Sequence, residues 1–317
     1  MKHVGMLSGG LVSWMTCKTV AKLHGTHDLS LLFADTIIED EDLYRFLVEG
    51  AAEIMGCGAP REVVDMAKSI PSLDDMAERK YHLRRMAFHA MEAIPGFHWV
   101  TDGRTPWEVF HDTKFLGNAR VAKCSHVLKQ KQCREWLERE CNPDDTTVYV
   151  GMSHHESHRF HGKDGKAGAR ELWLPWKCEA PLLDDQIMRR YHIVNYLGEA
   201  GIDPPRLYEM GAAHNNCGMF CVRAGQGQFE LLHREMPERY RHHEGQEQAF
   251  RENIGKDVAI LRDRRGGKTI PMTLLDFRER LECGEKGDGQ FGVCGCFVAG
   301  LEEEFSQRSL FDSEEIS

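Results

Sequence analysis

The sequence predicts an α/β protein with a parallel, Rossmann-like sheet flanked by helices, and three observations carry this prediction. Short apolar runs recur along the first half of the chain. Segments with apolar residues at helical spacing lie between several of these runs. The run from Leu29 to Ala34 is continuously apolar, as expected for a strand buried on both faces. Strands that alternate with helices are typical of parallel sheets.

The individual elements follow from the same periodicities. The expected strands are Lys2 to Leu7, Leu29 to Ala34, Arg61 to Val64, Phe97 to Thr101 and Thr146 to Gly151. The expected helices are Leu11 to Leu23 (with Gly25 as its C-cap), Glu39 to Met55, most of 68–95, about 124–141, and Leu183 to Glu199. The acidic run Glu39 to Asp42 suits the first turn of its helix.

The chain divides into three parts on composition. We expect an α/β domain over 1–210 and a less regular, Cys-rich subdomain over 211–300. The acidic segment 301–317 is expected to be a flexible tail. The glycine-rich segment 162–168 is expected to be a flexible loop.

Composition excludes several classes of protein. The chain of 317 residues is 41% hydrophobic and 28% charged, and it contains no apolar run of the length of about 18 residues that a membrane span needs. The net charge of −10 argues against a broad DNA-coating surface. Eleven cysteines without a visible secretory signal indicate a reducing compartment, so we expect a cytoplasmic protein, with homo-oligomerisation left open.

Charge is unevenly distributed within this acidic chain. The segment 113–134 contains six basic residues and no acidic one: Lys114, Arg120, Lys123, Lys129, Lys131 and Arg134. A local cationic segment in an acidic protein suits a small anionic ligand or a focused contact with a nucleic acid.

The joint between the first strand and the first helix suits an anion. Ser8, Gly9 and Gly10 form the turn, and Ser13 follows in the first helical turn. Glycines allow close backbone approach, and the amides and dipole of a helix N-terminus attract phosphate. The alternative is a plain tight turn in which a serine caps the helix. The joint lacks the Gly-Lys-Ser/Thr ending of a Walker loop and has too few glycines for the dinucleotide fingerprint.

Five segments together resemble one family. "SGGLVSW" resembles the PP-loop of adenine nucleotide α-hydrolases, with Val12 in place of the usual aspartate. "LFADTIIEDEDLYRF", "KCSHVLKQ", "GMSHHESHR" and "PLLDDQI" with "AGIDPPRLYEMGAAHNNCGMFC" resemble successive segments of its phosphoadenosine phosphosulfate (PAPS) reductase branch. The resemblance runs in order over about residues 2–225 and leaves 226–317 unexplained.

The resemblance implies a HUP-type fold and a site for ATP or PAPS. Ser8, Gly9, Gly10 and Ser13 would hold phosphates, with Lys129 and Arg159 as counter-ions, and Ser13, Asp35 and Arg159 are the candidate catalytic residues. Asp35 ends a strand beside the glycine turn, where a carboxylate can hold Mg²⁺ or contact the adenosine. The alternative for Asp35 is a helix N-cap, and Glu39 is a weaker candidate for the metal.

Two close cysteine pairs suggest a thiolate-held centre. Cys217 and Cys221 form one pair, and Cys294 and Cys296 the other. Their spacings are loose for zinc, so an iron–sulfur cluster is favoured over Zn²⁺, with buried inert thiols as the alternative. In the family, cluster cysteines lie at positions like Cys124, Cys217 and Cys221, but the adjacent Cys-Cys is Cys124-Ser125 here. Cys294 and Cys296 would supply the missing ligand.

Histidines crowd the loop that contains His154, His155 and His158, next to Arg159. A zinc site there is possible, but the spacing matches no standard motif. An Arg159–phosphate contact or a plain polar loop are the other interpretations. The exposed-looking run Arg262 to Lys268 suits the surface, or a nucleic acid.

Three functions remain open at this stage. The first is an ATP pyrophosphatase-type enzyme that activates an acceptor, such as a nucleobase in a nucleic acid, for attack by a sulfur donor. The second is reduction of PAPS or adenylyl sulfate, although Glu282-Cys283-Gly284 is only a faint match to the catalytic cysteine segment of those reductases. The third is a non-catalytic nucleotide-binding subunit.

Overall fold

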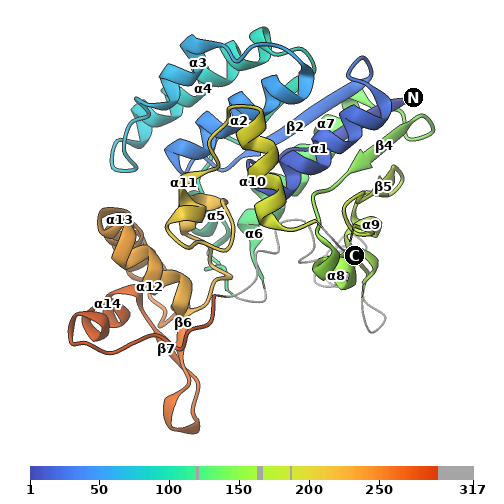
Figure 1. Ribbon diagram of the computed structural model, residues 1–317. Helices are drawn as coiled ribbons and strands as arrows, with labels where there is room; N and C mark the ends of the chain where they lie inside the picture. The colour runs from blue at the N-terminus through green and yellow to red at the C-terminus, as the bar shows by residue number, and fades with distance from the viewer. Residues whose placement is uncertain (119–120, 163–166, 186–187, 292–317) are drawn as a thin grey trace, which may run out of the picture.

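The computed structural model describes residues 1–118, 121–162, 167–185 and 188–291 (Figure 1). Three sequence expectations therefore lie outside the described residues: the cysteine pair Cys294 and Cys296, the acidic tail 301–317 and most of the 162–168 loop.

A five-stranded sheet forms the centre of the molecule, with strand order β3-β2-β1-β4-β5. Every pairing in it is parallel, which confirms the predicted parallel α/β sheet. The strands are β1 Lys2–Met6, β2 Leu29–Asp35, β3 Phe97–Thr101, β4 Thr146–Tyr149 and β5 Lys177–Glu179. Val4 of β1 pairs with Ser30 on one side and Val148 on the other. The edge strand β5 is too short to give a sequence pattern and was not predicted.

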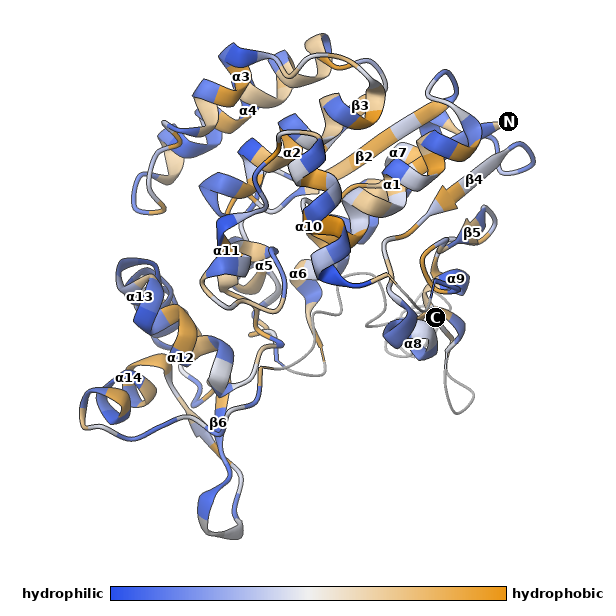
Figure 2. Cartoon of the chain, viewed as in Figure 1, coloured by the Kyte–Doolittle hydropathy of each residue, from blue (hydrophilic) through white to orange (hydrophobic). Residues whose placement is uncertain are grey.

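Helices cover both faces of this sheet (Figure 1). One face packs against α1 Leu11–His24, α2 Glu41–Met55, α3 Arg61–Ala67, α4 Met76–Ala93 and α10 Arg190–Glu199. The other packs against α7 Lys131–Glu140, α8 Ser157–His161 and α9 Ala169–Leu172. β2 is buried at every residue and is apolar through most of its length, as expected for a strand covered on both faces (Figure 2).

Short helical segments connect these layers. They are α5 Pro106–Thr113, α6 Lys123–Ser125, the π-helix η1 His126–Gln130, and the short helices η2 His154–Glu156, α11 Arg206–Glu209, η3 Cys217–Met219 and η4 Arg265–Gly267. The segments α6, η1 and α7 run on without a break, so the helix predicted at 124–141 is present. It contains a π-turn that the periodicity did not reveal.

Two element predictions are wrong. Arg61 to Val64 was expected to be a strand, but it begins helix α3. The helix places Val63 and Ala67 on the same buried face, one turn apart, so packing overrides the β preference of the Val63-Val64 pair. The helix expected from Leu183 begins only at Arg190, and Leu183 and Asp184 lie in a bend before it.

The C-terminal part is more regular than predicted. It contains α12 Gln226–Glu235, α13 Pro237–Ile254 and α14 Leu274–Glu282, with an antiparallel hairpin of β6 Leu261–Asp263 and β7 Ile270–Met272. These elements gather at one end of the molecule (Figure 1). Their core also includes Ile38, Trp107 and Leu207, so residues on both sides of the expected boundary at 210 pack into one cluster.

Candidate functional site

The order in which the chain adds strands to the sheet reverses between β1 and β4. The chain builds outward from β1 through β2 to β3, then returns to add β4 and β5 on the other side. Open α/β sheets bind ligands at such a reversal, beyond the carboxyl ends of the two strands. A cavity of about 280 Å³ lies there, lined by residues that include Met6, Ser8, Gly10, Val12, Ser13, Lys129, Gly151, Arg159, Tyr208 and His214. We call it the phosphate cavity.

The turn between β1 and α1 lies at one wall of this cavity, and the Ser13 side chain holds it in place. The Ser13 hydroxyl oxygen accepts from the Ser8 N–H at 3.1 Å and from the Ser8 hydroxyl at 3.0 Å, and it donates to the Gly10 carbonyl at 2.8 Å. Gly10 is the N-cap of α1 and has no side chain to cap the helix. The turn therefore presents the N-terminus of a helix of 14 residues to the cavity, where its dipole favours an anion.

Two glycines allow the backbone to pack around this turn. Gly9 has a φ of 77°, a conformation that favours glycine, and a Cβ there would meet Leu43 at 2.7 Å. A Cβ on Gly151, just after β4, would lie 2.6 Å from the Cα of Ser13. The loop after β4 thus lies directly against the first turn of α1, which places Arg159 near the glycine turn.

Two basic residues, Lys129 and Arg159, and one acidic residue, Glu156, line the phosphate cavity. Lys129 lies in the π-helix η1, the kind of irregular turn that is frequent at functional sites, and its side chain is only 5% exposed. Arg159 on α8 pairs with Glu156, which also accepts from Ser153 at 3.0 Å and so holds the loop. Burial, together with the charges of Lys129 and Arg159, lowers the pKa of His214 to about 4. His214 is therefore neutral at pH 7, mainly because it is buried, and the nearby Lys129 and Arg159 contribute to this.

Two residues that the sequence analysis did not single out close the cavity. The Tyr208 hydroxyl accepts from the Leu11 N–H at 3.3 Å, at the start of α1. The Asn215 amide donates to the Gly9 carbonyl at 2.8 Å, and its side chain is buried. Both belong to the segment "PRLYEMGAAHNN", so a segment far along the chain fastens onto the glycine turn.

A second, much smaller cavity lies beside the first. Its volume is about 20 Å³, enough for about one water molecule, and Cys124, Cys217 and Cys221 all line it, with Phe220 and Arg223 among their neighbours. We call it the cysteine cavity. Within the described part of the chain, no group of three or more His, Cys, Asp or Glu side chains is arranged to hold a metal ion. The predicted ligands Cys294 and Cys296 are outside that part.

Most of the other cysteines of the α/β domain belong to its core, whereas Cys57 is half-buried. Cys17, Cys133 and Cys178 are buried, and desolvation raises the pKa of each thiol to about 12. Cys124, Cys217 and Cys221 are half-buried instead. The structure thus separates packing cysteines from the three that meet at one cavity.

Lys129 lines both cavities. Its Nζ lies 3.2 Å from Glu39 Oε1, and the second oxygen of Glu39 accepts from the backbone N–H of Cys217. One carboxylate therefore connects the lysine of the phosphate cavity with the first cysteine of the cysteine cavity.

Asp35 does not lie at the phosphate cavity wall. Its carboxylate accepts from the Ile37 N–H at 2.7 Å, the Tyr44 hydroxyl at 2.8 Å and the Trp99 indole N–H at 3.2 Å. Burial raises the pKa of Asp35 to about 6. The N-cap of the following helix is Asp40 rather than Asp35. This arrangement does not fit Asp35 as a ligand of a nucleotide-bound Mg²⁺.

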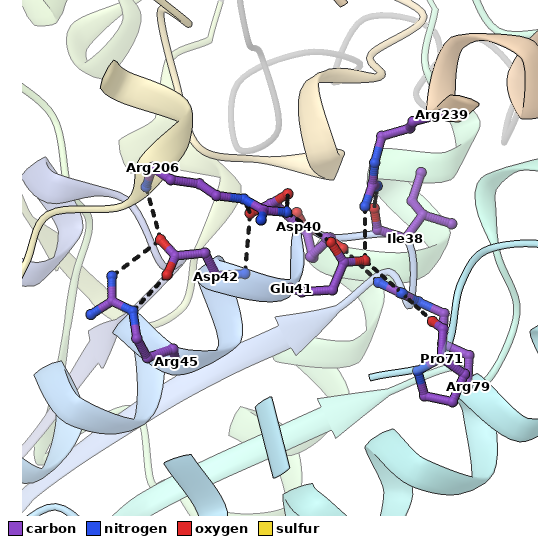
Figure 3. Close-up of polar contacts among 10 residues, drawn as sticks. Ile38, Asp40, Glu41, Asp42, Arg45, Pro71, Arg79, Arg206 and Arg239 are labelled. Atoms are coloured by element: carbon purple, nitrogen blue, oxygen red, sulfur yellow. Dashed lines mark hydrogen bonds and ion pairs between the residues drawn. The ribbon is translucent and has the colours of Figure 1, made fainter. Parts of the chain in front are cut away.

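The acidic run Glu39 to Asp42 does more than begin a helix (Figure 3). Asp40 pairs with Arg206 of α11 at 2.7 Å, and Glu41 pairs with Arg79 of α4 and Arg239 of α13 at 2.8 and 2.9 Å. Four acidic residues in sequence thus reach partners from several distant segments. Sequence reasoning found the run but not these partners, because only the fold brings the arginines together.

The remaining candidate residues, in the histidine loop and the basic segment, do not come together at one site. His154 donates to the Leu183 carbonyl at 2.8 Å through Nδ1. His155 and His158 are exposed, and the described residues of this loop form no histidine cluster for zinc. In the basic segment, Lys131 and Arg134 pair with Glu135 and Glu138 one helical turn away. Arg120 lies outside the described residues.

Comparison with known proteins adds no assignment. No protein family model matches this chain, and no curated protein matches it. Among the described helices, none is both long and apolar enough to cross a bilayer. The function is therefore inferred from the two cavities.

Proposed function

We propose that the protein is an enzyme that binds the phosphates of ATP, or of a related adenylyl nucleotide, at the turn formed by Ser8, Gly9, Gly10 and Ser13. The observation that carries this proposal is the phosphate cavity itself. It combines a helix N-terminus, a glycine turn and two cationic side chains at the reversal point of a parallel sheet. No other described cavity combines these features.

The reaction favoured is cleavage of the α–β phosphate bond of ATP. An acceptor oxygen attacks the α-phosphorus and becomes an adenylate, and pyrophosphate leaves with the bonding electron pair. The N-terminus of α1 and Lys129 stabilise the charge that develops on the pyrophosphate, and Arg159 contacts a phosphate oxygen. The acceptor is proposed to be a nucleobase and the nucleophile that displaces AMP to be a sulfur donor, as the family resemblance implies.

We propose that the three cysteines at the cysteine cavity contribute to a thiolate-held group that needs further ligands, because the described residues alone contain no cluster of three that could hold a metal ion. Cys124, Cys217 and Cys221 meet there, and thiolates bind iron–sulfur clusters and zinc. These three residues would hold the group, with Cys294 or Cys296 as the proposed fourth ligand, and the group would supply redox chemistry or sulfur binding beside the nucleotide. Mg²⁺ through Asp35 does not fit, because three internal donors occupy that carboxylate. The negative charge of the phosphates would therefore be compensated by Lys129 and Arg159.

A second candidate function is reduction of PAPS or adenylyl sulfate. The observation that favours it is the closeness of the two cavities, which share Lys129, so that a sulfur atom at the nucleotide would lie near thiols. Cys283, the faint match to the reductase nucleophile, is exposed at the end of α14 and lines neither cavity. This position favours the first candidate.

One assay separates the candidates. Protein purified without oxygen is incubated with labelled ATP or labelled PAPS, and pyrophosphate and sulfite are measured. Pyrophosphate supports the first function and sulfite the second, whereas tight binding with neither product indicates a nucleotide-binding subunit. The Arg159→Gln variant should lose binding, and Arg170→Gln, an exposed arginine on α9, is the matched control. Absence of nucleotide binding in the wild-type protein would refute the proposal.

A further inference from the structure

Glu39 occupies an unusual position between the two cavities. It follows β2, is fully buried, and its carboxylate accepts from three donors in three segments. Oε1 accepts from the Thr36 hydroxyl at 2.9 Å and lies 3.2 Å from Lys129 Nζ, and Oε2 accepts from the Cys217 N–H. A buried carboxylate with this set of donors is part of a connected polar network rather than a helix cap.

The backbone that carries Glu39 is held in place from outside. Arg79, which is fully buried, donates to the Ile37 carbonyl at 2.8 Å and to the Glu39 carbonyl at 2.7 Å. Arg239 donates to the Ile38 carbonyl at 2.9 Å, as Figure 3 shows. The main chain on either side of Glu39 is therefore fixed, and a change at one carboxylate oxygen cannot be absorbed by moving the loop.

Only one end of this link reaches the phosphate cavity. Lys129 lines the phosphate cavity and the cysteine cavity, whereas Cys217 lines only the latter. An anion in the phosphate cavity competes with Glu39 for the Lys129 ammonium. In a buried, low-dielectric place, a carboxylate that loses part of one partner binds its remaining donors more strongly.

We propose that Glu39 is a positioning residue that couples the two cavities, so that anion binding at Lys129 tightens the hold of Glu39 on the Cys217 amide. The proposal rests on the proposed function only in taking the anion to be a nucleotide phosphate. It gives Glu39 a task that differs from the metal ligation considered from sequence. The consequence is that the loop with Cys217 becomes more ordered when the phosphate cavity is filled.

Hydrogen exchange at the Cys217 amide tests this directly, without any need for turnover. The exchange rate of the peptide covering 215–221 is measured in the full-length protein, with the β2 strand (29–35) as internal reference. Pyrophosphate is the probe. In the wild-type protein, saturating pyrophosphate should slow exchange in 215–221 about threefold or more relative to β2. In Glu39→Gln, exchange in 215–221 should be about tenfold faster from the start, because a charged hydrogen bond is lost, and pyrophosphate should leave it unchanged.

Asp40→Asn is the matched control. It removes a buried carboxylate of the same loop that pairs with Arg206 and not with Lys129 or Cys217, so the pyrophosphate response should persist. If Glu39→Gln fails to fold, Glu39→Asp replaces it: the charge stays, but the shorter side chain cannot reach both partners, and the response should again be lost. A pyrophosphate response of equal size in wild-type and Glu39 variants would overturn the proposal.

A ligand-free arm keeps this test separate from the proposed function. Lys129→Met should change the exchange rate in 215–221 relative to β2 in the wild-type background and leave it unchanged in the Glu39→Gln background. If pyrophosphate protects no part of 8–15, the anion site is refuted, but the Lys129→Met pair still decides on the coupling. Equal effects of Lys129→Met in both backgrounds would contradict it.

Discussion

The two neighbouring cavities differ in size, in polarity and in how they are built. The phosphate cavity, about 280 Å³, is made from the turn after β1, the loop after β4 and the segment 208–216, together with Lys129. The cysteine cavity, about 20 Å³, brings Cys124 together with Cys217 and Cys221, which lie far from it in sequence. A local sequence pattern marks one wall of the first cavity, the glycine turn, whereas no local pattern marks the second.

A substitution of Lys129 should affect both cavities and have the largest effect, because this residue lines both of them. In Lys129→Met, the buried Glu39 carboxylate loses its cationic partner, so the free energy of unfolding should fall by about 3–5 kcal/mol. Anion affinity should fall at least about tenfold, a loss of about 1.4 kcal/mol. Denaturant unfolding and calorimetric titration with pyrophosphate measure the two effects. The exposed Lys131→Met is the control, and an equal loss in both variants would show that position 129 is not special.

Gly151→Ala should disturb the phosphate cavity alone. The new Cβ would lie 2.6 Å from the Ser13 Cα, so the loop after β4 must shift away from α1, at a cost of about 1–3 kcal/mol in stability. Affinity for pyrophosphate should fall while the metal content of the purified protein stays unchanged. Gly245→Ala, where a Cβ meets open space on α13, is the control. Unchanged affinity in Gly151→Ala would mean that this loop does not shape the anion site.

Cys221→Ser should disturb the cysteine cavity and leave the phosphate cavity unchanged. If the cysteine cavity holds iron or zinc, the bound metal per chain should fall to near zero, whereas nucleotide affinity should change by less than about twofold. Elemental analysis of anaerobically purified protein measures the metal. Cys57→Ser, at a half-buried cysteine outside the cavity, should keep full metal content. Full metal content in both variants would remove Cys221 from the proposed ligand set.

The smallest expected effect is a shift in the titration of His214. Its pKa is about 4 in the free protein because burial and the charges of Lys129 and Arg159 disfavour the imidazolium. An anion that neutralises those charges favours the imidazolium, so the pKa should rise toward the ordinary value near 6.5 when pyrophosphate binds. NMR of labelled histidines follows this titration. A pKa that stays the same or falls would mean that the anion binds away from His214.

The sequence predicted the α/β half of the fold well for a clear reason. Leu29 to Ala34 and Phe97 to Thr101 are short apolar runs, and such runs between helical segments have few alternatives to buried parallel strands. The same locality made Ser8 to Ser13 recognisable. Arg61 to Val64 failed because two adjacent valines favour a strand, whereas one-sided burial decided for a helix.

Helix α13 was missed because its buried face is largely polar, with Tyr240 and Phe250 as its apolar members. α13 buries Arg239, His243 and Glu247 at helical spacing, so a search for apolar periodicity finds little in it, and Figure 2 shows it mostly hydrophilic. Glu247 is buried because the N–H groups of Ile260 and Leu274 donate to it at 2.8 and 2.6 Å. Such partners exist only after folding, as do the partners of Glu39.

For the candidate site, the sequence indicated most of the residues at the phosphate cavity but not the orientation of every side chain. Ser8, Gly10, Ser13, Lys129 and Arg159 all line the phosphate cavity, and Gly9 forms its turn. Asp35 was placed correctly at the end of β2, but the direction of its side chain was not predictable. Its three donors, which include Tyr44 and Trp99, come from elements that only the sheet brings together.

A crystal structure of the protein with a bound adenine nucleotide would test the central claim most directly. The account predicts phosphate oxygens within hydrogen-bond distance of the backbone amides at the start of α1, with Lys129 and Arg159 on the same phosphates. Phosphates bound elsewhere, for example in the open groove beside β5 lined by Trp176 and Lys177, would contradict it.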